Sequence, residues 1–257
     1  MKQKVLNFSL GLLSVLLFFS CLDVNDEKLH VSYGVIQNVS SSDDYEILTD
    51  IGNKLVVTKS RTGQEIENDK RGLVNFEILS DKDKNNNVYE IKVNGFYNLL
   101  TKPLVNESYI LQNEEARRDS IGNDPFIDIN ARFGGEYINI NFEILYSPNY
   151  NGNHMINLVY DDTRAGSDTI HLTLYHNAYD EVPEKDSRLV RGIGRCSFKI
   201  ADLLPEGVTS KHVSFTWKQY DGYGTRMRTH TAIYRLGQAS ERDSNLSSSF
   251  ESYIEVK

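Results

Sequence analysis

The chain has 257 residues, of which 39% are hydrophobic and 25% charged, and its formal net charge is −8. This length suffices for one large domain or two small ones, and the ordinary charged fraction argues against global disorder. The acidic balance, without any cluster of Lys and Arg, repels a phosphate backbone and excludes nucleic acid as an expected partner.

Residues 1–20 predict a lipoprotein signal peptide. Lys2 and Lys4 precede an apolar run over residues 10–19, and Ser20 stands directly before Cys21. The run has about half the length that a membrane-spanning helix needs, so we expect the segment to be removed. A cysteine as the first mature residue is typical of bacterial lipoproteins. Cys21 is therefore the predicted attachment site of fatty acyl chains such as palmitate.

Residues 21–29 form the expected polar tether between the lipid and the folded protein. Acylation by two or three chains makes membrane attachment lasting, whereas one chain alone binds marginally. Asp23, Asp26 and Glu27 resemble the acidic signal that sends such lipoproteins to the outer face of the membrane. We therefore expect a lipid-anchored outer-membrane protein at the cell surface. A periplasm-facing orientation remains the alternative.

Beyond the tether, apolar side chains recur with a period of two rather than 3.6. The clearest segments are residues 74–78, 89–93, 138–144, 170–175 and 213–218. Such alternation is typical of half-buried antiparallel strands with one face in water. Clusters of Asp, Asn, Gly and Ser separate these segments and predict turns. The sequence therefore predicts an all-β fold.

The strand count divides this β structure into two units. Residues 30–103 would hold five or six short strands, which suits a small closed barrel. Residues 124–236 would hold seven or eight, which suits an antiparallel β-sandwich. Residues 104–123 are the expected linker, and its stretch from Asn113 to Ser120 is prone to form a helix. Residues 237–257 are a C-terminal extension, whose residues 250–256 have the pattern of an edge strand.

Several stretches carry a family resemblance. They are residues 92–102, 119–125, 134–140, 154–159 and 171–180. Together, and in this order, they resemble the NigD-like lipoproteins of Bacteroidales, and the likeness runs from Cys21 to about Leu236. The resemblance implies an N-terminal OB-like barrel, a C-terminal β-sandwich and a link to bacteriocin immunity. It supplies no catalytic or ligand-binding residues.

Three histidines of the second unit, His154, His171 and His176, are candidate ligands. His176 is in phase with the apolar residues of its strand, His154 is in phase with Ile156, and His171 points to the opposite face. The two inward histidines could meet, with Asp180 nearby as a third ligand. Because the chain lacks tightly spaced metal ligands, we interpret the histidines as hydrogen-bonded structural groups and expect no metal or cofactor. A metal site is the alternative.

No arrangement of residues predicts catalysis. Ser120 precedes Gly122 but lacks the strand, turn and helix of a nucleophile elbow. Cys196 shares a face with Phe198 and Ile200, so we interpret it as a buried thiol, which has no disulfide partner if Cys21 is acylated. The acidic residues 161–162 and 180–181 lack the alternate spacing of a calcium loop. We therefore expect no enzyme and no catalytic residues.

Tyrosines on predicted loops are the remaining candidates. They are Tyr146, Tyr150, Tyr179, Tyr220 and Tyr223. Such residues cap the ends of a sandwich, stack on sugars or anchor protein partners. The sequence thus predicts a lipid-anchored, non-enzymatic binding module of the envelope, with bacteriocin immunity as one form of that role. The alternative is a glycan-binding accessory lipoprotein at the surface; the partner, protein or glycan, is unknown.

Overall fold

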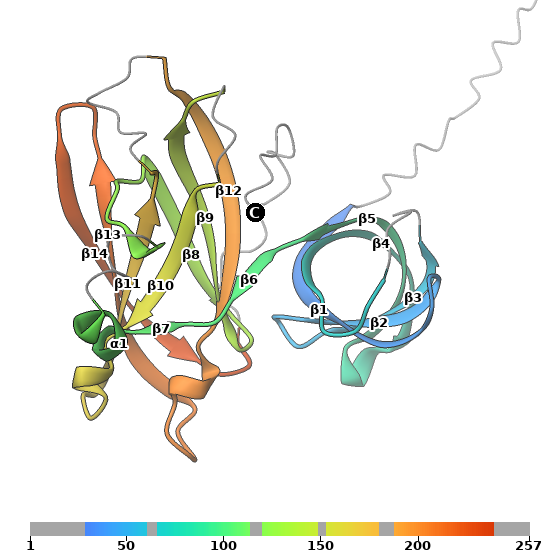
Figure 1. Ribbon diagram of the computed structural model, residues 1–257. Coiled ribbons are helices and arrows are strands. Elements are labelled where there is room, and N and C mark those ends of the chain that lie inside the picture. Colours follow the sequence, from blue (N-terminus) through green and yellow to red (C-terminus); the bar gives the residue numbers. More distant parts are fainter. Residues whose placement is uncertain (1–28, 61–65, 114–119, 149–152, 180–187, 239–257) are drawn as a thin grey trace, which may run out of the picture.

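The computed structural model describes residues 29–60, 66–113, 120–148, 153–179 and 188–238 (Figure 1). The predicted signal peptide, Cys21, the acidic pair at 180–181, Tyr150 and the segment 250–256 lie outside these residues. Within the described part, two β units lie side by side, and the chain passes from one to the other along strand β6. No helix in this part is long and apolar enough to cross a membrane.

The first unit is a closed five-stranded barrel. Its strands are β1 (His30–Ser41), β2 (Asp44–Thr49), β3 (Lys54–Ser60), β4 (Arg71–Asp83) and β5 (Val88–Asn98). They pair in the order β1-β2-β3-β5-β4, and β4 pairs back onto β1. The β3–β5 pair is parallel and the other pairs are antiparallel. A small closed barrel of five strands has OB-like architecture, which confirms the prediction.

The barrel closes because each strand sends alternate apolar side chains inward. Its core consists of Ile36, Tyr45, Ile47, Leu55, Val57, Val74, Phe76, Ile91, Val93 and Phe96. Between β4 and β5 lies the short 3-10 helix η1 (Lys84–Asn86), and the Asp83 carboxylate accepts from the amides of Asn85 and Asn86. This cap satisfies amides that the short helix leaves without partners.

The second unit is a β-sandwich of two sheets. One sheet has the order β14 (Thr225–Arg235), β13 (Ser210–Tyr220), β11 (Thr169–Asn177), β10 (Met155–Tyr160), β7 (Val105–Asn106). The other has the order β6 (Leu100–Lys102), β12 (Val190–Lys199), β9 (Tyr137–Tyr146), β8 (Asp128–Gly134). Inward side chains from both sheets form one core around Phe142, Leu172 and Phe198. The all-β fold class is confirmed, although both sheets include parallel pairs: β11–β13, β10–β7 and β12–β6.

The chain between the two units contributes to the sandwich. β6 pairs with β12 in one sheet, and β7 pairs with β10 in the other. The strands of the sandwich sheets therefore begin at Leu100, whereas the sequence predicted that the barrel ends at residue 103 and that the sandwich begins at residue 124. Helix α1 (Glu107–Gln112) precedes the stretch that the sequence indicated as helix-prone, and residues 114–119 of that stretch lie outside the described part. Two more 3-10 helices, η3 (Asp162–Arg164) and η4 (Ala201–Leu203), occupy loops of the sandwich.

The barrel packs against the outer face of the β9–β12 pair. Asn139 and Ser197 lie on this outer face, and both side chains are buried under the barrel. The Arg71 guanidinium donates to Asn139 at 2.8 Å and to Ser197 at 3.0 Å. The alternating pattern predicted that this face of the sheet contacts water. That prediction is wrong here, because such a pattern cannot show that a second unit covers the face.

Candidate functional site

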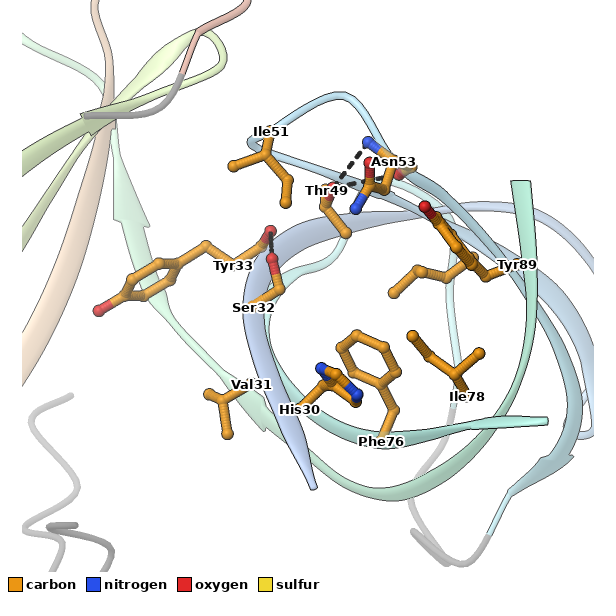
Figure 2. Close-up of a pocket in the computed structure, with 11 residues that line it drawn as sticks. His30, Val31, Ser32, Tyr33, Thr49, Ile51, Asn53, Phe76, Ile78 and Tyr89 are labelled. Atoms are coloured by element: carbon orange, nitrogen blue, oxygen red, sulfur yellow. Dashed lines mark hydrogen bonds between the residues drawn. The ribbon is translucent and has the colours of Figure 1, made fainter. Parts of the chain in front are cut away.

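A pocket of about 390 Å³ opens at one end of the barrel. Four chain segments meet there: the start of β1, the turn from β2 to β3, the middle of β4 and the start of β5. Figure 2 shows Phe76 and Ile78 on the inside of the ring of strands, with Thr49, Asn53 and Tyr89 at the rim. The pocket is thus part of the barrel end and needs no movement of the sandwich to form.

The floor of the pocket is apolar. Leu55 and Phe76 belong to the barrel core, and Ile78 lies beside them with 40% of its surface exposed. The His30 ring stacks on the Phe76 ring, with centroids 5.5 Å apart and planes inclined by 27°. Ile51, on the turn above, is 48% exposed. An apolar group entering the pocket would therefore cover two side chains that water now contacts.

The rim of the pocket carries polar side chains of two kinds. The Thr49 hydroxyl is already used inside the β2–β3 turn, since it donates to the Asn53 carbonyl at 3.1 Å and accepts from the Asn53 amide at 2.9 Å. The Ser32 hydroxyl donates to the neighbouring carbonyl of Tyr33. By contrast, the side chains of His30, Asn53 and Tyr89 make no hydrogen bond to any described residue.

The chain enters the barrel at this same end. β1 begins at His30, which lines the pocket, and Leu29 just before it is exposed. The predicted lipid site Cys21 lies outside the described residues, separated from His30 only by residues 22–29. Sequence reasoning missed the pocket, because its lining comes from segments up to about sixty residues apart that only barrel closure brings together.

A second hollow, of about 350 Å³, lies on the outer face of the five-stranded sheet. Its floor is made by polar side chains of β11 and β13, among them His171, Thr173 and Thr216. Leu111 of α1 and Arg164 of η3 contribute to its lining. Desolvation by burial, followed by the charge of Arg164, lowers the pKa of His171 below its ordinary value. The neutral imidazole is therefore favoured, and the groove offers hydroxyl and ring nitrogen groups to a polar ligand.

The two inward histidines meet, as the strand phase suggested. His154 Nδ1 lies 2.8 Å from His176 Nε2, and the two rings stack with centroids 5.0 Å apart. His176 Nδ1 lies 3.3 Å from the Pro125 carbonyl, which can only accept. We therefore assign the proton of His176 to Nδ1, which leaves Nε2 as the acceptor for the Nδ1–H of His154.

This histidine pair is closed to solvent. His176 is 1% exposed, and the Phe126 ring packs against its imidazole ring, with the two centroids 5.2 Å apart. Burial, followed by the nearby His154, lowers the pKa of His176 to about 3. Asp180, considered as a third ligand, lies outside the described residues. Within the described part, no three His, Cys, Asp or Glu side chains gather as a metal site. The geometry is that of a hydrogen-bonded histidine pair buried in the sandwich.

Cys196 lies in the same core, together with Phe198 and Ile200, as the period of two indicated. Burial raises the pKa of its thiol, and the Lys102 charge opposes that shift only in part. Lys102 donates to the Ile156 carbonyl and the Asn157 side chain, both at 2.8 Å. A protonated thiol enclosed by apolar side chains is a poor nucleophile.

The loop tyrosines do not gather into one platform among the described residues. Tyr223 is fully exposed at the β13–β14 turn, and Tyr179 is partly exposed with a left-handed φ of 48°. Tyr220 donates to the Gly222 carbonyl and so stabilises that turn. Tyr146 is half-buried at the end of β9. Tyr223 is the one of these four that is free to contact a partner through its whole ring.

Known proteins match this architecture. Residues 108–230 match the model of the NigD-like C-terminal beta sandwich domain. A crystal structure of a candidate toxin-related protein from Parabacteroides distasonis is 26% identical, with a TM-score of 0.58 over 79% of this chain and 93% of that chain. No curated protein matches the sequence.

Two further crystal structures share the fold at lower identity. A NigD-like immunity protein from Bacteroides caccae is 18% identical, with a TM-score of 0.60 over 81% of this chain and 97% of that chain. A candidate lipoprotein from Bacteroides fragilis is 12% identical, with a TM-score of 0.59 over 81% of this chain and 99% of that chain. Since the matches span nearly the whole length of these proteins, the barrel and the sandwich occur in them together.

Proposed function

The chain is a NigD-like protein, and from that premise we propose that it is a lipid-anchored, non-enzymatic binding module of the cell envelope. The observation that supports this role is the preformed pocket of about 390 Å³ at the barrel end where the chain from Cys21 enters. Pockets of this size, apolar with a few polar groups at the edge, typically bind small ligands or single side chains. The reactive side chains support the same role, because Cys196 and His176 are enclosed in the sandwich core.

The anchor is the part of the proposal that the sequence supports most directly. The fold is also found in a candidate lipoprotein. Mass spectrometry of the protein purified from its native membrane should find Cys21 at the N-terminus with fatty acyl chains attached. A Cys21→Ser variant should leave the membrane fraction. An intact leader, or an unmodified start site, would contradict the anchor.

The side of the membrane is a separate question. We propose attachment to the outer membrane with the protein facing the medium, as Asp23, Asp26 and Glu27 indicate. Protease treatment of intact cells should then degrade the protein, while a periplasmic marker survives. Protection until the cells are lysed would show that it faces the periplasm.

Immunity to a bacteriocin is the specific form of binding that we propose first, because a structure with this fold is named a NigD-like immunity protein. Deletion of the gene should raise sensitivity to bacteriocin-containing supernatants of related strains. The wild-type gene should restore resistance, and the Cys21→Ser gene should not. Unchanged sensitivity of the deletion strain would reject immunity as the function. That result would not contradict the lipid anchor or ligand binding by the pocket.

Glycan binding is the alternative that one observation favours. The groove over β11 and β13 presents His171, Thr173 and Thr216 in a row of polar groups, and such groups bind sugar hydroxyls. Isothermal titration with polysaccharides should detect binding that His171→Ala weakens, whereas His212→Ala on the same sheet should leave the affinity unchanged. No heat at millimolar sugar would contradict this alternative.

A further inference from the structure

We propose that the barrel pocket binds the aliphatic chain of a fatty-acid-like amphiphile, with the polar head of the ligand at the rim. This inference rests on the proposed function, because it names the ligand class of the same pocket. The chain would lie over Leu55, Phe76 and Ile78, and the head would meet His30, Asn53 and Tyr89.

The lining selects an aliphatic chain over a peptide or a sugar. A peptide brings backbone amides and carbonyls that need partners, and a closed barrel has no free strand edge to supply them. A sugar brings hydroxyl groups on all sides, and the floor offers them the apolar side chains of Leu55, Phe76 and Ile78. An alkyl chain has no polar groups that need hydrogen-bond partners, and it would cover the exposed surfaces of Ile51 and Ile78.

The rim supplies the partners for one polar head. His30, Asn53 and Tyr89 each carry a donor group, and none of the three side chains is hydrogen-bonded to a described residue. In Figure 2 the Asn53 and Tyr89 side chains lie near one another at the upper rim, while the His30 ring lies lower, against Phe76. A carboxylate or ester oxygen at the opening could therefore accept from these groups while its chain remains on the floor.

The position of the pocket brings such ligands within reach. Residues 22–29 link Cys21 to the pocket, and an extended chain spans at most about 3.3–3.6 Å per residue. An acylated Cys21 therefore holds the opening within roughly 30 Å of the bilayer surface. Free fatty acids and the acyl chains of membrane lipids share the required chemistry at that surface.

The test uses the mature chain, residues 21–257, with Cys21→Ser, so that its outcome is independent of acylation. Laurate is titrated below its micellar concentration and binding is followed by isothermal calorimetry. We expect one site per chain. Ile78→Glu should weaken binding at least tenfold, because it puts a charged carboxylate on the pocket floor, against the aliphatic chain of the ligand. The matched control is Leu79→Glu, at the next residue on β4. Leu79 is 48% exposed, against 40% for Ile78, but does not line the pocket. The affinity of this variant for laurate should stay within twofold of that of the unsubstituted protein.

A second arm distinguishes the source of the ligand. The same three proteins are sedimented with vesicles of phosphatidylethanolamine and phosphatidylglycerol. Binding of laurate together with co-sedimentation that Ile78→Glu abolishes would identify bilayer lipid, and laurate binding alone would identify free fatty acid. No laurate binding at millimolar concentration would overturn the inference, as would equal losses in the Ile78 and Leu79 variants. The anchor itself is tested separately by the mass of native Cys21.

Discussion

The Arg71 guanidinium and the Asp50 carboxylate lie 2.6 Å apart at the junction of the barrel and the sandwich, and their side chains are 1% and 7% exposed. The same guanidinium donates to Asn139 and Ser197 of the sandwich and packs over the Tyr137 ring, 3.8 Å from its centroid. A barrel strand thus places its charge against the outer face of a sandwich sheet. Asp50 balances that charge, so the two units are joined by a buried network rather than by the chain alone.

Asp50→Asn should destabilise the protein by about 3–5 kcal/mol, because it leaves the Arg71 charge buried without a counter-ion. Urea denaturation measures the change in free energy of unfolding. The control is Glu67→Gln, which breaks the exposed pair with Lys70 and should cost less than about 1 kcal/mol. Equal effects of the two substitutions would contradict the structural role of the buried pair.

Acid should destabilise the protein through His176. Its pKa is about 3 when folded, against an ordinary 6.5, so the unfolded chain takes up the proton first. The contribution of the neutral ring is fully present above pH 6.5 and decreases as the pH falls toward 3, by about 1.4 kcal/mol per pH unit. Stability curves from pH 7 to 4.5 should show this slope.

His176→Gln serves as the test of that assignment, because glutamine does not titrate. The variant should be less stable at pH 7, since it disturbs the bond with His154, but its stability should depend less on pH than that of the wild type. His212→Gln, on the exposed side of β13, should keep the wild-type slope. If the slope persists unchanged in His176→Gln, another group must cause it.

The thiol of Cys196 should not react with a disulfide reagent in the folded protein. The thiol is buried, so a reagent cannot reach it, and burial also raises its pKa, so the thiolate fraction is small. With Cys21→Ser as background, one thiol per chain should react in concentrated guanidinium chloride and none under native conditions. A Ser210→Cys variant, exposed at the start of β13, provides the reactive control. Rapid native labelling of Cys196 would show that the core opens.

Gly194→Ala should destabilise the sandwich by about 1–3 kcal/mol through overpacking. An added Cβ would lie 2.2 Å from Cζ of Phe142, which pairs across the strands and fills the core. Gly166→Ala is the control, because its Cβ would meet nothing within 4 Å and should change stability by less than about 0.5 kcal/mol. Adding Phe142→Leu to Gly194→Ala should recover part of the loss.

Periodicity predicted the strands because it records which side chains face a core. Residues 138–144 and 213–218 became parts of β9 and β13, and the inward phase of His154 and His176 brought their rings into contact. The phase placed the two rings on one face, but their distance of 2.8 Å depends on the pairing of β10 with β11. A strand pattern contains no information on the register of its neighbour.

The sequence by itself determined the all-β fold class, the inward residues of each strand and the family likeness, because alternation and turn residues are local properties of the chain. Only the tertiary structure decided that Leu100–Lys102 belongs to the sandwich, that Arg71 is buried against Asn139 and that a pocket lies between His30 and Tyr89. Each of these depends on contacts between segments distant in the chain. Closure of the barrel and its packing on the sandwich fix such contacts, and no local pattern encodes them.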